Sequence, residues 1–148
     1  MKKCLICSNE FNPFVDFGSM PIANAFSTKK ELENEYFFPM QVGFCETCKM
    51  VQLLEQPDRE KMFHDSYAFF SSTSNYMINH FKKFANSVSS LQNLSKKSFV
   101  VEIGSNDGIM LQNFVSDNIP CLGVEPSKNV AHVAMERGIE VTTEFFDR

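Results

Sequence analysis

The sequence predicts an α/β chain in which a small cysteine-rich domain precedes the first half of a doubly wound parallel sheet. Two Cys-x-x-Cys pairs, CLIC and CETC, lie within the first 48 residues. Later in the chain, short apolar runs alternate with helical patterns in the order β-α-β-α-β. A doubly wound sheet normally has more than three strands, so we expect an incomplete sheet in a chain that is a fragment or a truncated product.

The first predicted domain, residues 1–60, is expected to be loop-rich and irregular because proline and glycine recur along it. Each Cys-x-x-Cys turn brings two sulfur atoms within reach of one ion, and two such turns complete a tetrahedral thiolate set that suits zinc. The predicted ligands are Cys4, Cys7, Cys45 and Cys48. Because sulfur would occupy every position, the metal would be structural. Unmetallated buried thiols and a redox dithiol are the two alternatives.

A connecting helical region is predicted over residues 61–97. Ser74 or Asn75 can cap a helix there, and apolar residues recur after them at helical spacing. These apolar residues are Met77, Ile78, Phe81, Phe84, Ala85, Val88 and Leu91. The spacing predicts a single apolar stripe along the helix.

The last predicted domain, residues 98–148, begins with an apolar run over residues 99–103. This run is broken only by Glu102, which is typical of a parallel strand covered on both faces. The further predicted elements are a turn (104–108), a helix (109–115), a strand (121–125), a helix that Ser127 caps and Gly138 ends, and a strand (139–143).

The first glycine turn of this domain presents backbone N–H groups at the start of a helix, where anions bind. It departs from the dinucleotide fingerprint G-x-G-x-x-G, because Asn106 stands where the second glycine lets a pyrophosphate approach. The pattern actually present is Glu-x-Gly-x-x-x-Gly, formed by Glu102, Gly104 and Gly108. S-adenosylmethionine has no pyrophosphate, and either Glu102 or Asp107 can pair with its cationic groups while the turn holds its carboxylate.

Glu125 ends the second predicted strand, about 20 residues after Gly104, where an acidic side chain accepts the hydroxyls of a ribose. The turn and Glu125 together fit a nucleoside ligand that lacks a pyrophosphate. One alternative is a tight turn with a solvated strand end and no ligand. A second is a dinucleotide-dependent oxidoreductase, against which Asn106 argues.

Charge and hydropathy exclude several classes of protein. The net charge of −4 argues against a nucleic-acid partner, which requires a basic face. No apolar run approaches the roughly 18 residues of a membrane span, and the first residues lack the apolar core of a signal peptide. We therefore expect a cytoplasmic protein with reduced cysteines and with no membrane partner.

Seven segments, in order along nearly the whole chain, carry a family resemblance. They are CLIC, FGSMPIANAF, FCETCKMVQLLE, SYAFFSSTS, VVEIGSNDGIMLQNF, GVEPSKNVA and RGIEVTTEFF. This set resembles the N-terminal portion of the deoxysugar C-methyltransferases, which use S-adenosylmethionine to methylate nucleotide-linked ketosugars. The resemblance implies a structural zinc domain followed by a truncated Rossmann-like S-adenosylmethionine-binding domain.

The resemblance also implies roles for particular residues. The cofactor pocket would be framed by Glu102, Gly104, Asn106, Gly108, Glu125 and Pro126. The region around Tyr67 would face the nucleotide-linked sugar. In this family the later portion of the chain completes the sheet and supplies a histidine base, and we expect that portion to be missing here.

The family's reaction removes a proton beside a ketone, and the resulting enolate attacks the sulfonium methyl group. In this chain the catalytic candidates are Tyr67, which could donate to the enolate oxygen, and His80, the nearby imidazole. The alternatives are a half-buried tyrosine with a satisfied hydroxyl and a structural histidine. FFSSTSN is expected to be a substrate loop or lid, or only a helix cap.

Without the missing base we expect this chain to bind zinc, to bind the cofactor weakly and to show no turnover. The other prediction is a non-catalytic, zinc-stabilised binding module. Because an incomplete sheet exposes apolar strand edges, we also expect association or instability of the chain.

Overall fold

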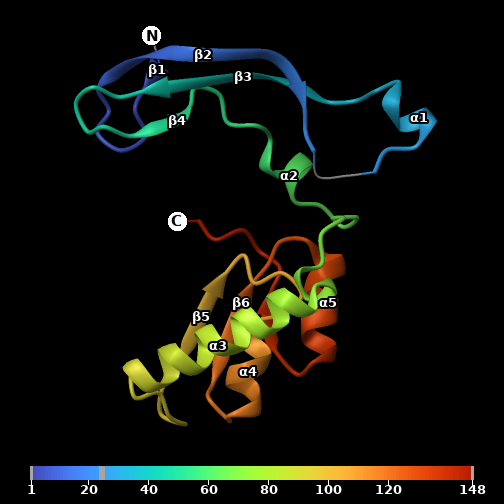
Figure 1. Ribbon diagram of the computed structural model, residues 1–148. Helices are drawn as coiled ribbons and strands as arrows, with labels where there is room; N and C mark the ends of the chain where they lie inside the picture. The colour runs from blue at the N-terminus through green and yellow to red at the C-terminus, as the bar shows by residue number, and fades with distance from the viewer. Residues whose placement is uncertain (1, 24–25, 148) are drawn as a thin grey trace. The chain divides into compact units, whose positions relative to one another are not determined.

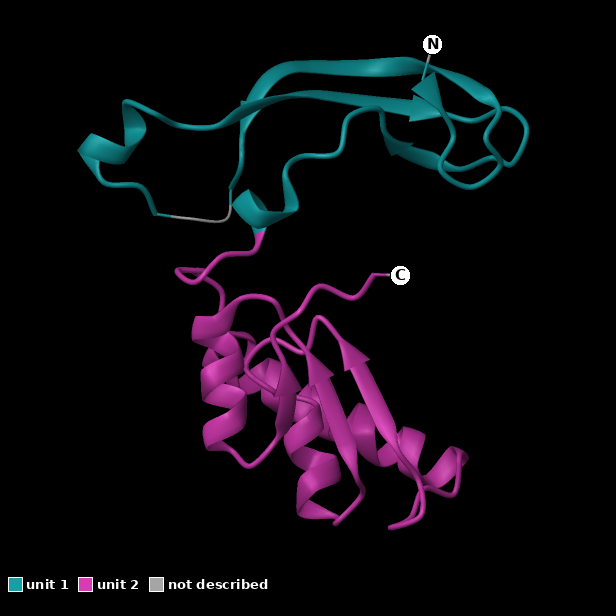
Figure 2. Cartoon of the chain, turned by 180° about the vertical axis from the view of Figure 1, so that it is seen from behind, with its two compact units in different colours: residues 1–62 teal, residues 63–148 magenta. Residues whose placement is uncertain are grey.

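The computed structural model describes residues 2–23 and 26–147 of the chain. These residues form two compact units, Met1–Met62 and Phe63–Arg148 (Figure 1; Figure 2). The first unit contains both Cys-x-x-Cys pairs, and the second contains the glycine turn. Most of the segment predicted as a connecting region, residues 63–97, packs within the second unit.

The first unit is built on an antiparallel sheet in which the strands follow one another in chain order. They are β1 (Lys2–Lys3), β2 (Glu10–Pro21), β3 (Phe37–Phe44) and β4 (Val51–Leu53). The short helices α1 (Lys29–Leu32) and α2 (Arg59–Met62) complete the unit. β2 and β3 are the longest strands of the described chain and pair along most of their length.

The expectation of a loop-rich, irregular first domain is therefore wrong. Proline and glycine lie within the β2–β3 ladder, at places where its register shifts. One shift falls between Pro13 and Val15. Another falls between Asp16 and Ser19 and contains Gly18, which has a φ of +76°. Bulges accommodate residues that a regular ladder excludes, so these turn formers mark irregularities of a strand and not its ends.

The core of the first unit is very small. Its buried apolar residues are Cys4, Phe11 and Cys45, with Cys7 and Leu54 packed against them. Gly43 is required for this packing, because a Cβ at that position would lie 2.4 Å from the ring of Phe11. A cluster of this size contributes little hydrophobic stabilisation, so the unit depends on a further constraint.

The second unit contains a parallel three-stranded sheet with two intervening helices. The strands are β5 (Val100–Ile103), β6 (Cys121–Val124) and β7 (Glu140–Thr142), in the order β5-β6-β7. The helices are α4 (Leu111–Ser116) after β5 and α5 (Lys128–Glu136) after β6. This element order is the one that the sequence predicts, although α4 begins later than the predicted helix 109–115.

The second unit also contains the long helix α3 (Asn75–Leu91), preceded by the 3-10 turn η1 (Ser71–Thr73). Ser74 caps α3, and its side chain accepts a hydrogen bond from the backbone of Met77, as the sequence predicts. Neither α3 nor any other helix among the described residues has the length and apolar character needed to cross a bilayer.

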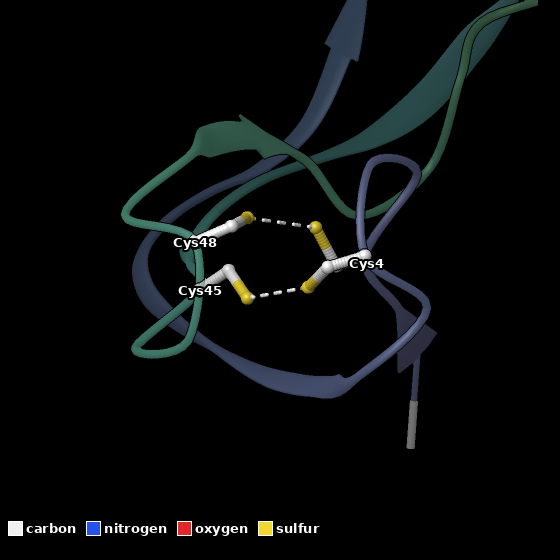
Figure 3. A group of neighbouring side chains, drawn as sticks. Cys4, Cys45 and Cys48 are labelled. Carbon is white, nitrogen blue, oxygen red and sulfur yellow. Dashed lines mark hydrogen bonds between the residues drawn. The ribbon is translucent and has the colours of Figure 1, made fainter.

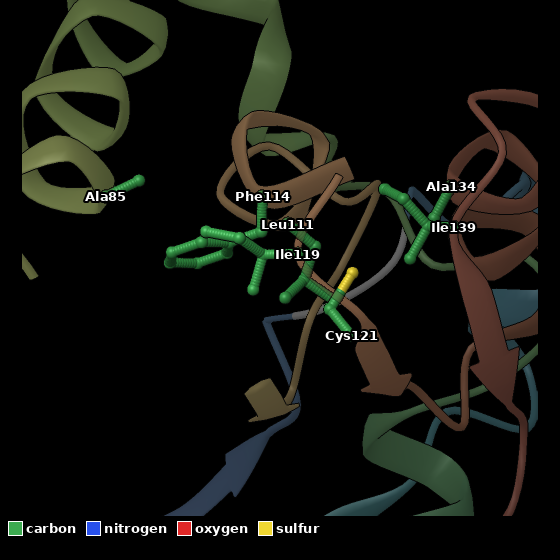
Figure 4. Close-up of a cluster of buried hydrophobic side chains, with 7 residues drawn as sticks. All are labelled: Ala85, Leu111, Phe114, Ile119, Cys121, Ala134 and Ile139. Carbon is green, nitrogen blue, oxygen red and sulfur yellow. The ribbon is translucent and has the colours of Figure 1, made fainter. Parts of the chain in front are cut away.

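The core of the second unit lies between the sheet and these helices (Figure 4). Its buried members are Ala85, Leu111, Phe114, Ile119, Cys121, Ala134 and Ile139. The predicted apolar stripe of α3 is only partly used, because Phe84 and Leu91 are exposed while Ala85 is buried against the neighbouring helix. The apolar stripe of a helix marks the residues that can be buried. How many of them are buried depends on the area of the surface against which the helix packs.

β5 is not covered on both faces, in contrast to the prediction from its apolar run. Val100 packs against the core, whereas Val101 and Ile103 are 48% and 58% exposed. Successive strand residues point to opposite faces of a sheet, so these two share the uncovered face. α3 crosses the other face, in front of the strands in Figure 1 and behind them in Figure 2.

Candidate functional site

The four paired cysteines converge on one point in the first unit. Their sulfur atoms all lie within 4.8 Å of one another. Cys4 and Cys48 approach to 3.6 Å between sulfur atoms, and Cys7 and Cys45 to 3.5 Å (Figure 3). Zinc–sulfur bonds of about 2.3 Å in a tetrahedron place sulfur atoms about 3.8 Å apart, so this donor set fits zinc in both chemistry and spacing.

The two Cys-x-x-Cys turns have the same backbone arrangement. In the first, the N–H of Ser8 donates to the carbonyl of Cys4, and in the second, the N–H of Lys49 donates to the carbonyl of Cys45. Ser8 and Lys49 both adopt a positive φ, 61° and 64°. Each turn therefore reverses the chain immediately after its second cysteine, and both pairs of sulfur atoms face a common centre.

Asn9 supports the first of these turns. Its side-chain amide lies 3.4 Å from the sulfur of Cys7, and hydrogen bonds from its side chain and backbone lower the pKa of Cys7 to about 6. A lowered thiol pKa favours the thiolate, which is the form that binds a metal. Asn9 thus acts as an outer partner of the kind that tunes metal ligands.

The glycine turn of the second unit follows β5 directly. Gly104, Asn106 and Gly108 have positive φ values of 73°, 50° and 76°. Gly108 is also packed closely, since a Cβ there would lie 2.2 Å from the Cδ1 atom of Ile139. The N–H groups of Gly104 and Ser105 both donate to the carbonyl of Val124, which fixes the turn at the carboxyl end of β6.

Glu125 lies directly after β6 and is buried. Its Oε2 atom accepts a hydrogen bond of 3.0 Å from the backbone N–H of Asn106, and its Oε1 atom accepts one of 2.9 Å from that of Ser127. The structure therefore brings Glu125 to the glycine turn, as the sequence predicts, and Pro126 lies between Glu125 and Ser127 in the chain. The Oγ atom of Ser127 is buried and has no hydrogen-bond partner among the described residues.

Two further polar side chains, Glu102 of β5 and Ser105 of the turn, lie on one face of the sheet. Glu102 is in register with Gly123, and a Cβ at Gly123 would lie 2.5 Å from the Oγ atom of Ser105, so these side chains share one face of the sheet. The Oε2 atom of Glu102 and the Oγ atom of Ser105 are buried without a partner among the described residues. Burial raises the pKa of Glu102 to about 7. Buried polar atoms normally have partners, so this pair fits the presence of a further bound group.

Asp107, the other acidic residue of the turn, is turned into the protein. It is fully buried, and its Oδ2 atom accepts hydrogen bonds from the backbone and the hydroxyl of Ser72, at 3.0 and 2.5 Å. The guanidinium of Arg137 donates to its backbone carbonyl at 2.7 Å. Both acidic residues predicted to pair with a cationic ligand have a carboxylate oxygen without a hydrogen-bond partner among the described residues, but the Oδ1 atom of Asp107 lies 3.7 Å from the guanidinium of Arg137.

Tyr67 lies near the turn, whereas His80 does not contact it. The backbone carbonyl of Tyr67 accepts a hydrogen bond of 2.8 Å from Asn129, and burial together with the negative charge of Glu125 raises the pKa of its phenol. His80 is exposed on α3, and in the described chain its ring contact is with Phe81, at 5.5 Å between centroids. The structure thus joins the first catalytic candidate to the site and leaves the second on the surface.

Sequence reasoning missed Ser72 and Arg137. No local pattern marks them, because Ser72 precedes Asp107 by 35 residues and Arg137 by 65. The spacing of the turn likewise gave no sign that the side chain of Asn106 would bind another segment.

Two comparisons with known proteins agree with this site. Residues 4–63 match a family model described as "Putative zinc binding domain". The chain is 30% identical over 140 residues to the C-methyltransferase NovU of Streptomyces niveus, across 93% of this chain and 33% of that protein. This chain therefore spans about a third of the length of the curated relative. The resemblance to C-methyltransferases is confirmed, and all four cysteines lie within the matched zinc-binding region.

Proposed function

We propose that this chain carries the structural zinc domain and the cofactor site of an S-adenosylmethionine-dependent C-methyltransferase that acts on a nucleotide-linked ketodeoxysugar. The observation that carries the proposal is the match to a C-methyltransferase across both units, joined to a polar site at the carboxyl ends of β5 and β6. The sugar class rests on the family resemblance of the sequence segments. The fold that goes with it is Rossmann-like, and it continues beyond three strands in such enzymes.

Zinc has a structural role in this proposal. Cys4, Cys7, Cys45 and Cys48 would hold it through four thiolates. No ligand position is left for water or substrate, so the metal would stabilise the first unit without taking part in the reaction.

The cofactor would be recognised by two glutamates, Glu125, which is buried, and Glu102, which is partly buried. Glu125 stands where acidic residues accept ribose hydroxyls, and the N–H groups of Asn106 and Ser127 orient its carboxylate. Glu102 has an oxygen without a partner among the described residues, which suits a cationic amino group. The absence of a second fingerprint glycine favours a ligand without a pyrophosphate.

Tyr67 is the residue of this chain best suited to act on the sugar. A tyrosine phenol is protonated at neutral pH, and the raised pKa of Tyr67 favours that form further, so it can donate a hydrogen bond to an enolate oxygen. S-adenosylmethionine would supply the methyl group as a sulfonium. Within the described part of the chain no histidine is joined to the turn by a contact, so the base that removes the sugar proton would come from outside the described residues.

Calorimetric titration with S-adenosylmethionine and, separately, with NAD tests the proposal. We expect one zinc per chain, binding of S-adenosylmethionine and no binding of NAD. Glu125→Gln should weaken cofactor binding about tenfold or more, because it removes charge from a buried acceptor. Glu136→Gln is the matched control at an exposed site and should bind as the wild type does.

Binding of NAD alone would reject the methyltransferase assignment in favour of an oxidoreductase. Zinc without either nucleotide would favour the second candidate, a zinc-stabilised binding module. That candidate is kept because the match covers only a third of the relative.

A further inference from the structure

One segment before α3 lies along the glycine turn and is anchored at three points. We call residues 67–73 the strap. At its start, the carbonyl of Tyr67 accepts a hydrogen bond from Asn129 of α5. In its middle, the backbone of Phe69 and Ser71 binds the side chain of Asn106. At its end, Ser72 binds Asp107.

The middle anchor explains why asparagine occurs at position 106. Its φ of 50° lies in the left-handed region, which asparagine tolerates better than most residues. Its side-chain amide makes two hydrogen bonds to the strap, donating to the carbonyl of Phe69 at 3.0 Å and accepting from the N–H of Ser71 at 2.9 Å. Asn106 therefore adopts a left-handed backbone conformation that glycine also tolerates, and its side chain adds two hydrogen bonds that glycine cannot make.

The end anchor is reinforced by a positive charge. Arg137, at the end of α5, donates to the hydroxyl of Ser72 and to the backbone carbonyl of Asp107, both at 2.7 Å. Its guanidinium also lies 3.7 Å from the Oδ1 atom of Asp107. A fully buried carboxylate is costly unless it is paired, so this arrangement ties Asp107, Ser72 and Arg137 into one unit.

We propose that Asn106, Asp107 and Arg137 are positioning residues that latch the strap onto the glycine turn and so hold the strap, with Tyr67 at its start, against that turn. The N–H groups of Ser71 and Ser72 are bound by these side chains, so loss of the latch would leave both without their partners. The latch is inferred from the hydrogen bonds described above, without reference to any cofactor. Its consequence for cofactor affinity rests on the proposed function.

Hydrogen exchange of the purified chain tests the latch without any cofactor. Arg137→Met should speed exchange of the strap amides about tenfold or more relative to the wild type, with exchange in β6 unchanged. Arg137→Lys keeps the positive charge but loses the two guanidinium nitrogens that bind Ser72 and Asp107, so the strap amides should exchange at an intermediate rate. Lys82→Met removes one positive charge from an exposed site on α3 and should exchange as the wild type does. Unchanged strap exchange in Arg137→Met would overturn the proposal.

A second pair of variants covers the case in which Arg137→Met fails to fold. Asn106→Gly keeps the left-handed backbone and removes both bonds to the strap, so strap exchange should again rise about tenfold. Asn118→Gly is its matched control, because Asn118 has a φ of 57° at the end of α4 and is exposed. Equal strap exchange in these two variants would also overturn the latch.

Titration with S-adenosylmethionine separates the latch from the proposed function. We expect Asn106→Gly to bind the cofactor about fivefold or more weakly than Asn118→Gly, because a mobile strap populates the binding-competent state less often. Equal affinities with a mobile strap would show that the strap does not position the site, and the proposal would fail. A wild type that does not bind the cofactor would refute the proposed function, while the exchange rates would still decide the latch.

Discussion

The two units of this chain bury their residues in opposite ways. In the first unit the buried apolar residues are Cys4, Phe11 and Cys45, and two of these three are candidate metal ligands. In the second unit a larger apolar cluster between helices and sheet supports a buried polar group at the glycine turn. From this contrast we expect the first unit to take its stability from a bound metal, whereas in the second unit apolar packing already holds the residues around the glycine turn in place.

Removal of zinc should have the largest effect, and it should be confined to the first unit. Structural zinc contributes on the order of 10 kcal/mol to small domains, far more than the core of this unit supplies. Chelation, or Cys45→Ser, should therefore expose residues 1–62 to protease while residues 63–148 stay resistant, as mapped by mass spectrometry. Cys121→Ser is the control, because Cys121 lies in the second core and its loss should leave one zinc bound. Equal protection of both units after chelation would refute this division.

Phe114→Ala should produce the reverse pattern. Phe114 is fully buried in the second core, and its truncation should lower the free energy of unfolding of that unit by about 3–5 kcal/mol. Zinc content should not change. Phe84→Ala, the same substitution at a half-exposed position on α3, should cost less than about 1 kcal/mol in urea unfolding. Similar losses in the two variants would mean that the described core does not carry the stability.

The two glycines of the turn separate backbone strain from packing. Gly104→Ala adds a Cβ to open space at a φ of +73°, so it should cost about 1 kcal/mol through strain alone. Gly108→Ala adds the same strain at +76° and places the Cβ 2.2 Å from Ile139, which should cost about 1–3 kcal/mol more. Urea unfolding of the two variants measures the difference, and equal costs would contradict the close packing at Gly108.

The smallest expected effect is a pH dependence of the second unit. Burial raises the pKa of Glu102 from 4.5 to about 7, so the folded state holds this proton more tightly than the unfolded state. The contribution of Glu102 to the free energy of unfolding should fall as the pH rises from 4.5 to about 7 and stay constant above that. Glu102→Gln should remove this slope from urea midpoints, whereas the exposed control Glu136→Gln should keep it.

The convergence of the four cysteines was predictable from the sequence because it rests on local chemistry. Two residues between cysteines bring their sulfur atoms together within a single turn, whatever the rest of the fold does. The β-α-β-α-β order was also readable, since each element of the second unit carries its own periodicity. The β2–β3 ladder was missed because Pro13 and Gly18 lie at bulges inside it, where they resemble the ends of strands.

The sequence by itself determined the four cysteine ligands, the strand–turn–helix with its glycines and the placement of Glu125 at the end of β6. Only the tertiary structure decided that Asp107 binds Ser72 and Arg137, that Asn106 binds the strap, that His80 lies on the surface and that one face of β5 is uncovered. The first group depends on spacings of a few residues along one element. The second depends on contacts between residues 30 to 65 positions apart, which packing creates and no local pattern encodes.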